Sequence, residues 1–167
     1  EEFSVNWVHC ICQNSSMNEK EREEFLEKFQ ENQESLVAFC IMGGIFSEGI
    51  DLMGEKLIGA ILVGTGLPQV SNEREILREF YMEKGENGFD YAYRYPGMNK
   101  VLQAAGRVIR TREDTGVILL LDERFWKREY SSLFPIEWND RKRCTLSNVE
   151  QQLHAFWEDR TERNGCN

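Results

Sequence analysis

Short, uninterrupted apolar runs limit what this chain can fold into. They lie at 35–42 (SLVAFCIM), 57–65 (LIGAILVGT) and 117–121 (VILLL), and a less regular run covers 7–13. Continuous apolarity over so few residues is typical of strands that are covered on both faces, as in parallel sheets. We therefore expect a parallel β-sheet.

The segments between these runs carry helical signals. Apolar residues recur at helical spacing within 16–32, where Ser16–Glu19 has a capping-box pattern, within 72–84, and near the end around Val149–Trp157. Because strands and helices alternate, we expect an α/β fold with a three-layer parallel sheet and right-handed crossovers.

Composition and charge exclude several classes of protein. The chain has 167 residues, 41% of them hydrophobic, which is enough for one domain with a real core. No apolar run approaches the ~20 residues of a membrane span, so we expect no membrane partner. We expect a cytoplasmic location, because its reducing surroundings fit the cysteines. The net charge of −9 opposes free-standing nucleic-acid binding, which rests on cationic contacts to phosphate.

The domain organisation follows from the same pattern. We expect one domain over 1–145, lacking its first strand and helix, and a closing amphipathic helix with a polar tail over 146–167. The opening Glu1-Glu2-Phe3 is expected to be internal sequence of a longer protein.

The cysteines give no metal-binding pattern. They are odd in number and contain no pair of C-x-x-C units. Cys10 and Cys12 should share one face of a strand, with His9 on the other, and we expect buried reduced thiols there. No metal site is expected in this chain.

The strongest candidate site is the segment 103–110 (QAAGRVIR). Its helix is expected to bury Met98, Val101, Leu102, Ala105, Val108 and Ile109. Gln103, Gly106, Arg107 and Arg110 stand at i, i+3, i+4 and i+7 and should form a stripe on the opposite side. Two guanidiniums suit a bound phosphate, because arginine offers a rigid fork of donors and stays charged. The alternative is a solvated helix face.

The chain just before this helix contains two further features. Tyr95-Pro96-Gly97 is expected to break the chain. The aromatic residues between Phe89 and Tyr95 stand at i, i+2 spacing, which favours a packed loop over a base-stacking surface.

Two ordered motifs resemble one helicase family. Segment 103–110, with Asp114-Thr115-Gly116 and a strand ending Asp122-Glu123-Arg124-Phe125, resembles motif VI of the iron–sulfur-type superfamily 2 helicases, the DinG/XPD family. Residues 44–52 (GIFSEGIDL) resemble motif V of that family. The resemblance spans roughly Gln13–Trp138. It implies the RecA-like second motor domain of an ATP-dependent DNA helicase that translocates 5′ to 3′ on single-stranded DNA.

The resemblance also implies roles for the arginine segment. Arg110 is the first candidate for the arginine finger, with Arg107 beside it on the β and γ phosphates, and the two roles can be exchanged. Gln103 would orient the γ-phosphate or the attacking water. Gly106 would let the helix approach the first RecA-like domain of the same chain.

For the segment that resembles motif V, the expected ligands are DNA and nucleotide. Gly44, Ser47 and nearby amides are expected to take a DNA phosphate. Glu48 and Asp51 are acceptors, so with Gly49 they would meet the nucleotide ribose, a catalytic water or an arginine. The alternative is a glycine-rich turn with structural carboxylates.

The ATP, Mg²⁺ and iron–sulfur cluster that the resemblance implies would need residues outside this chain. The sequence has no G-x-x-x-x-G-K-[ST] motif, so ATP and Mg²⁺ would need the P-loop of the first motor domain. Any 4Fe-4S cluster would also lie outside this chain. Residues 119–123 (LLLDE) look like a Walker B strand without a P-loop to serve, so Asp122 and Arg124 are expected to pair structurally or brace the arginine helix. Asp114 should cap the turn into that strand.

A rival hypothesis needs no catalysis. The chain would then be a helicase-like interaction or regulatory module that kept the fold and lost the motor.

Overall fold

This computed structural model describes residues 3–5, 8–29, 35–44, 57–111 and 114–164. The chain divides into two compact units, Glu1–Leu133 and Phe134–Asn167, and each is described by itself. The domain boundary expected between residues 145 and 146 stays a prediction.

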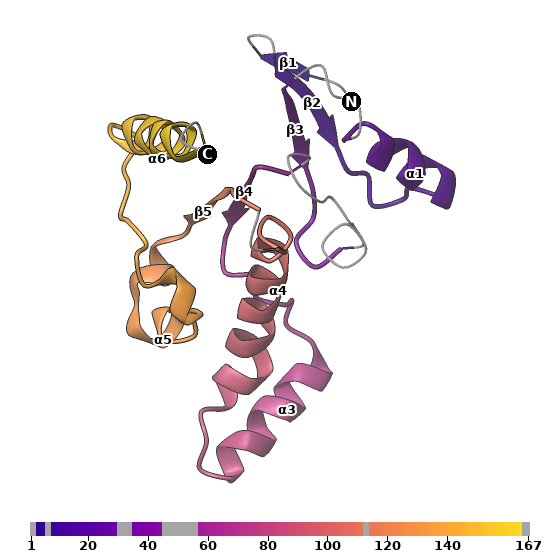
Figure 1. Ribbon diagram of the computed structural model, residues 1–167. Coiled ribbons are helices and arrows are strands. Elements are labelled where there is room, and N and C mark those ends of the chain that lie inside the picture. Colours follow the sequence, from indigo (N-terminus) through magenta and orange to yellow (C-terminus); the bar gives the residue numbers. More distant parts are fainter. Residues whose placement is uncertain (1–2, 6–7, 30–34, 45–56, 112–113, 165–167) are drawn as a thin grey trace. The chain divides into compact units, whose positions relative to one another are not determined.

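The first unit contains two small β-sheets (Figure 1). In one, β2 (Val8–Cys12) pairs antiparallel with β1 (Phe3–Val5) and parallel with β3 (Leu36–Phe39). In the other, β4 (Gly59–Val63) and β5 (Val117–Leu121) pair in parallel. The α/β class and the parallel pairing are therefore confirmed, and β1 is an addition that the sequence analysis did not expect.

A three-layer arrangement around one sheet is not established. Within the described ranges β3 and β4 belong to separate sheets. Phe39, Ile61 and Val63 keep 59%, 61% and 71% of their surface exposed, and each alternates with a less exposed neighbour along its strand. The expected burial of both strand faces is wrong for the described residues, because they cover only one face of each strand.

Helix α1 (Glu19–Glu27) connects β2 to β3 and packs Phe25 against Ile11 of β2. Its N-cap is Asn18, whose Oδ1 accepts the Glu21 N–H at 3.1 Å, while the Glu21 carboxylate accepts the Asn18 N–H at 2.7 Å. The expected capping box at Ser16 is thus wrong by two residues. Asparagine is as good an N-cap acceptor as serine, and here its partner glutamate stands three residues on.

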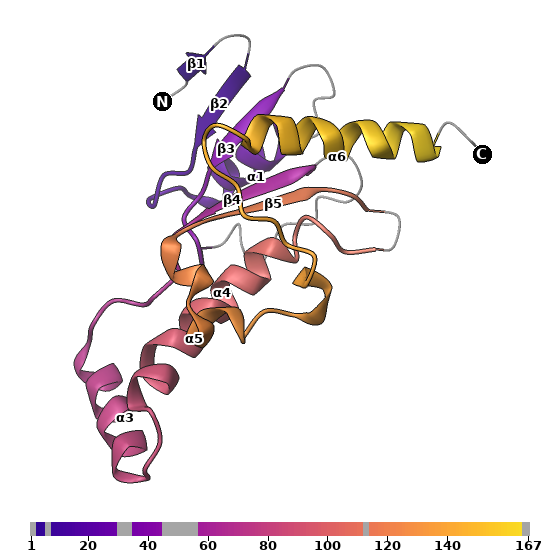
Figure 2. The same cartoon turned by 90° about the vertical axis from the view of Figure 1, so that its left-hand side faces the viewer.

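Between β4 and β5 the chain forms a helical arm (Figure 2). Helix α3 (Asn72–Glu83) starts at Ser71, whose hydroxyl accepts the Arg74 N–H. A π-helical turn, η2 (Asp90–Arg94), then runs without a break into α4 (Tyr95–Ala105). Helix α3 packs against η2 in this arm.

The expected chain break at Tyr95-Pro96-Gly97 is wrong. Pro96 lies in the first turn of α4, where a missing N–H costs little. The expected aromatic loop is also wrong, since Tyr91 lies in η2. Its ring stacks on Tyr81 at a centroid distance of 3.8 Å and meets the edge of Tyr95 at 5.2 Å. Because the rings of Tyr81, Tyr91 and Tyr95 pack against one another, this contact favours a packing role over stacking on bases.

After β5 the first unit ends in two short helical segments. They are η3 (Glu123–Trp126) and α5 (Arg128–Ser131), which bury Phe125 and Tyr130 respectively. The second unit contains η4 (Ile136–Trp138) and α6 (Val149–Asn164). The closing helix therefore starts where the sequence placed it. None of the described helices is long and apolar enough to cross a membrane.

The first turn of α4 packs directly against the loop after β4, because glycines at the contact, Gly97 and Gly66, leave the two backbones room to approach. A Cβ on Gly97 would lie 2.6 Å from the Thr65 carbonyl oxygen, and one on Gly66 would lie 2.6 Å from the Gly97 carbonyl oxygen. Gly66 also has a φ of +66°, which favours glycine. This backbone approach lets α4 bury Met98 and Val101 almost completely.

We predict that Gly97→Ala lowers the free energy of unfolding by about 1–3 kcal/mol, because the new methyl group meets rigid backbone. Urea unfolding followed by circular dichroism measures this. Gly106→Ala is the matched comparison: its Cβ would lie 3.3 Å from the Leu102 carbonyl oxygen, a milder contact than the 2.6 Å at Gly97, and the change should cost clearly less. Equal stability of the two variants would contradict a close backbone contact between Gly97 and the loop after β4.

Candidate functional site

The segment that carries the candidate arginines begins on α4 and ends beyond it. Helix α4 stops at Ala105, with Gly106 as its C-cap. The N–H of Arg107 then donates to the Ala104 carbonyl at 3.2 Å, and the N–H of Val108 donates to the Ala105 carbonyl at 3.1 Å. These i to i−3 bonds extend the helix by one tight turn, after which the chain leaves it.

The predicted stripe of four residues on one helix face is therefore wrong. Gln103 is exposed on α4, Gly106 is exposed at its C-cap, and Arg107 is half-buried in the tight turn. Arg110 is half-buried beyond the last helical turn. The three-residue spacing cannot place Arg110 above Arg107 once the helix has ended, because helical phase holds only within a helix.

The apolar side of the same segment follows the prediction more closely. Met98, Val101, Ala105 and Val108 are all buried. Ile109 is 42% exposed, because it lies past the turn. The burial of Val108 draws the chain against the core directly after the helix, between the two arginines.

Asp114 holds the backbone around Arg110. Its Oδ2 accepts the Arg110 N–H at 2.9 Å and the Thr111 N–H at 2.8 Å. The expected capping of the turn before β5 is confirmed. The Asp114 carboxylate thus holds the backbone of Arg110 in place.

A second turn lies at the carboxyl end of β3. The N–H of Gly44 donates to the Ile41 carbonyl at 3.0 Å, and Gly43 has a φ of +78°. The Ile41 N–H in turn donates to Oε1 of Gln13 at 2.8 Å. The sequence analysis missed Gln13, although a polar residue directly after an apolar strand is a usable signal for such a role.

This turn lies against the arginine helix. The side chain of Lys100 on α4 passes Gly43 so closely that a Cβ there would lie 2.8 Å from the lysine Cδ. Met42 is also close to Gly66, at 3.1 Å from the position of a Cβ. The end of β3, the loop after β4 and α4 therefore meet at one place.

The remaining residues of the motif V resemblance cannot be placed. Ser47, Glu48, Gly49 and Asp51 fall within 45–56, outside the described residues, so the predictions for them stay predictions. Gly44, at the near end of that segment, is described and half-buried.

The predicted pairing of Asp122 with Arg124 is confirmed. Oδ1 of Asp122 accepts from Nε of Arg124 at 2.9 Å, and Oδ2 accepts from a terminal nitrogen at 2.7 Å. These hydrogen bonds lower the pKa of Asp122. Because the guanidinium engages both oxygens, the carboxylate is set up as a structural ion pair and as the cap of η3.

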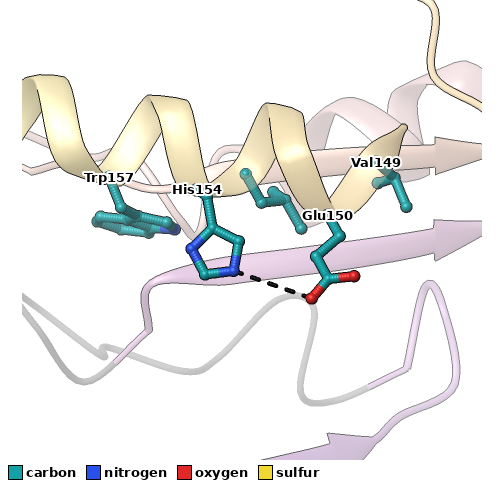
Figure 3. A pocket seen from close by; sticks show the side chains of 5 residues that line it. Val149, Glu150, His154 and Trp157 are labelled. Carbon is teal, nitrogen blue, oxygen red and sulfur yellow. Dashed lines mark ion pairs between the residues drawn. The ribbon is translucent and has the colours of Figure 1, made fainter. Parts of the chain in front are cut away.

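The described residues also bear on two other kinds of ligand site. The described residues hold no cluster of three or more His, Cys, Asp or Glu side chains that fits a metal ion. A shallow, mostly apolar hollow runs along α6 between Val149 and Trp157, beside the His154–Glu150 pair at 3.9 Å (Figure 3). It contains none of the predicted site residues.

Comparison with known families gives a match over most of the chain. The family described as helicase C-terminal domain matches residues 3–141. That range includes α4, the arginine segment, Asp114 and the Asp122–Arg124 pair, and it ends inside the second unit.

Individual relatives agree with this match. A regulator of telomere elongation helicase 1 homolog from Caenorhabditis briggsae is 29% identical over 138 residues, covering 75% of this chain and 13% of that protein. The ATP-dependent DNA helicase DinG of Photobacterium profundum is 34% identical over 115 residues, covering 67% and 16%. A probable ATP-dependent helicase of Methanocaldococcus jannaschii is 30% identical, covering 65% and 18%. The chain thus spans less than a fifth of the length of these relatives.

We predict that Asp114→Ala loosens the arginine segment. Losing both hydrogen bonds should lower the free energy of unfolding by about 1–2 kcal/mol and speed amide exchange at Arg110 and Thr111. Hydrogen exchange with mass spectrometry measures the second effect. Asp140→Ala, at an exposed position, is the control and should change stability by no more than about 0.5 kcal/mol. Unchanged exchange at the two amides would contradict the anchoring role.

Proposed function

Since this chain belongs to the helicase C-terminal domain family of the DinG/XPD-like helicases, we propose that it is the second, RecA-like motor domain of an ATP-dependent DNA helicase. The helicase would move on single-stranded DNA, 5′ to 3′. The observation that carries the proposal is the arginine segment at the end of α4, anchored by Asp114 and lying inside the family match.

The proposed chemistry is charge stabilisation during phosphoryl transfer. Charge builds up on the transferred phosphoryl oxygens, and an arginine finger delivered to them is worth about 10³–10⁵ in rate. Arg110 is the proposed finger, because Asp114 holds its backbone and so reduces the reorganisation needed at the moment of reaction. Arg107 would bind the β and γ phosphates, and exposed Gln103 would orient the γ-phosphate or the attacking water.

Another domain must complete the nucleotide site. Because this sequence has no P-loop, ATP and Mg²⁺ would be held by a first RecA-like domain of the same chain, which Gly106 would let approach closely. Glu48, Gly49 and Asp51 would meet the nucleotide from this side. Any 4Fe-4S cluster would belong to that other domain, and a cytoplasmic location remains a prediction.

DNA contact is proposed at the carboxyl end of β3. The Gly43–Gly44 turn and Ser47 would take backbone phosphate without reading sequence. The close contact between Lys100 and Gly43 supports a coupling of this turn to α4. A change in nucleotide state at the arginine segment would then reach the DNA-binding turn through one helix.

The decisive experiment uses a protein that joins this chain to its P-loop domain. We predict that Arg110→Ala lowers DNA-stimulated ATP hydrolysis by roughly 10³ or more, with nucleotide binding retained, because only the transition state loses a partner. Steady-state turnover and binding of a fluorescent nucleotide measure the two effects.

Two further variants serve as a control and as a test of which arginine is the finger. Arg22→Ala, at an exposed position on α1, is the control and should leave turnover unchanged. If Arg110→Ala is silent and Arg107→Ala is not, Arg107 is the finger. If both are silent, or the wild-type protein does not hydrolyse ATP, the motor proposal is wrong and a non-catalytic helicase-like module takes its place.

We also predict that the 167-residue chain alone hydrolyses no ATP, because a finger without a P-loop has no bound phosphate to act on. A phosphate-release assay with single-stranded DNA present measures this. Turnover above that of the Arg110→Ala variant of the same chain would show that the chain holds a nucleotide site of its own.

A further inference from the structure

The second unit contains a basic segment that the motor proposal does not use. Arg141, Lys142 and Arg143, here called the basic segment, lie between η4 and α6 and are all exposed. Between residues 134 and 148 the only other charged residues are Glu137 and Asp140, so this stretch has a net charge of +1 in a chain of −9. The family match ends at its first residue.

Aromatic side chains lie directly beside this segment. The Phe134 and Trp138 rings pack at a centroid distance of 5.1 Å. The Arg141 guanidinium lies over the Phe134 ring at 5.2 Å and donates to the Trp138 carbonyl at 3.2 Å. Both rings keep part of their surface exposed. A cation is thus held on an aromatic ledge formed by Phe134 and Trp138.

Ordered turns flank the basic segment on both sides. Before it, the N–H groups of Trp138 and Arg141 donate to the carbonyls of Pro135 and Trp138, at 3.0 and 3.2 Å. After it, the Thr145 N–H donates to Oδ1 of Asn148 at 2.7 Å, directly before α6. The three cations are therefore presented on a short stretch with fixed ends, which lowers the entropy lost when a ligand binds.

We propose that the basic segment and the aromatic ledge bind single-stranded DNA, as a contact separate from the Gly43–Gly44 turn. Cations that can follow a phosphate backbone, with the partly exposed residue Trp138 beside them for a base to stack on, are the combination that single strands need. An acidic peptide would use the cations but gains little from the rings, so the single strand is the better fit. The proposal rests on the proposed function only for the identity of its ligand.

The expected size of the effect follows from counterion release. Each phosphate contact on a single strand contributes about 0.7 to the slope of log affinity against log salt, so three contacts contribute about 2. Between 50 and 200 mM salt, the dissociation constant of the wild type should therefore rise roughly 20-fold more than that of a protein without the basic segment.

The test is fluorescence anisotropy of a labelled 20-nucleotide oligo-dT with the full 167-residue chain, without nucleotide. The Arg141→Gln, Lys142→Gln, Arg143→Gln triple variant should bind more weakly, with a salt slope smaller by about 2. The Lys20→Gln, Arg22→Gln, Lys84→Gln triple variant removes the same charge at exposed positions elsewhere and should bind like the wild type. Circular dichroism confirms that each variant is folded.

Several outcomes would overturn the proposal. They are equal binding by both triple variants, full competition by polyglutamate, and no preference for oligo-dT over a duplex of the same length. Trp138→Leu tests the ledge: affinity should fall with the salt slope unchanged, because stacking releases no counterions, and unchanged affinity would remove the ledge from the site. The assay contains no nucleotide and measures only DNA binding by this chain, so a negative result here would leave the ATP-hydrolysis test of the motor proposal unaffected.

Discussion

The backbone contact between Gly97 and the Thr65–Gly66 turn determines where α4 lies. With no side chain on either glycine, the first turn of the helix reaches the loop after β4 directly. That approach lets Met98 and Val101 enter the core, and it sets the line along which α4 runs to its end at Ala105. The position of the arginine segment follows from this seat, because it begins at the last turn of the helix.

Helix and turn contribute differently to the candidate site. Arg107 belongs to a tight turn that is hydrogen-bonded to the end of α4, whereas Arg110 belongs to a turn that Asp114 holds through two backbone N–H groups. The two arginines therefore have independent supports, so a change that disturbs one need not displace the other. The Lys100–Gly43 contact adds a link from the same helix to the end of β3.

Much of the fold was predictable, because it depends on local patterns. Continuous apolar runs predicted β2 to β5 to within a few residues, and helical periodicity predicted α3 and α6. Near-neighbour chemistry also predicted the Asp122–Arg124 pair and the cap made by Asp114. The predictions failed where two local signals competed, as at Asn18 against Ser16, or where neighbours from elsewhere in the chain decided, as in the stacking of Tyr91 on Tyr81.

By itself, the sequence determined the family, the α/β class and the identity of the candidate site residues, because these depend on residue types in a fixed order along the chain. The tertiary structure decided that α4 ends before Arg110, that Gln13 and Lys100 support the turn after β3, and that Phe39 of β3 and Ile61 and Val63 of β4 stay exposed. The physical reason is that helix ends and close contacts depend on which backbone groups find partners and which side chains find room. Residues distant in sequence set both conditions.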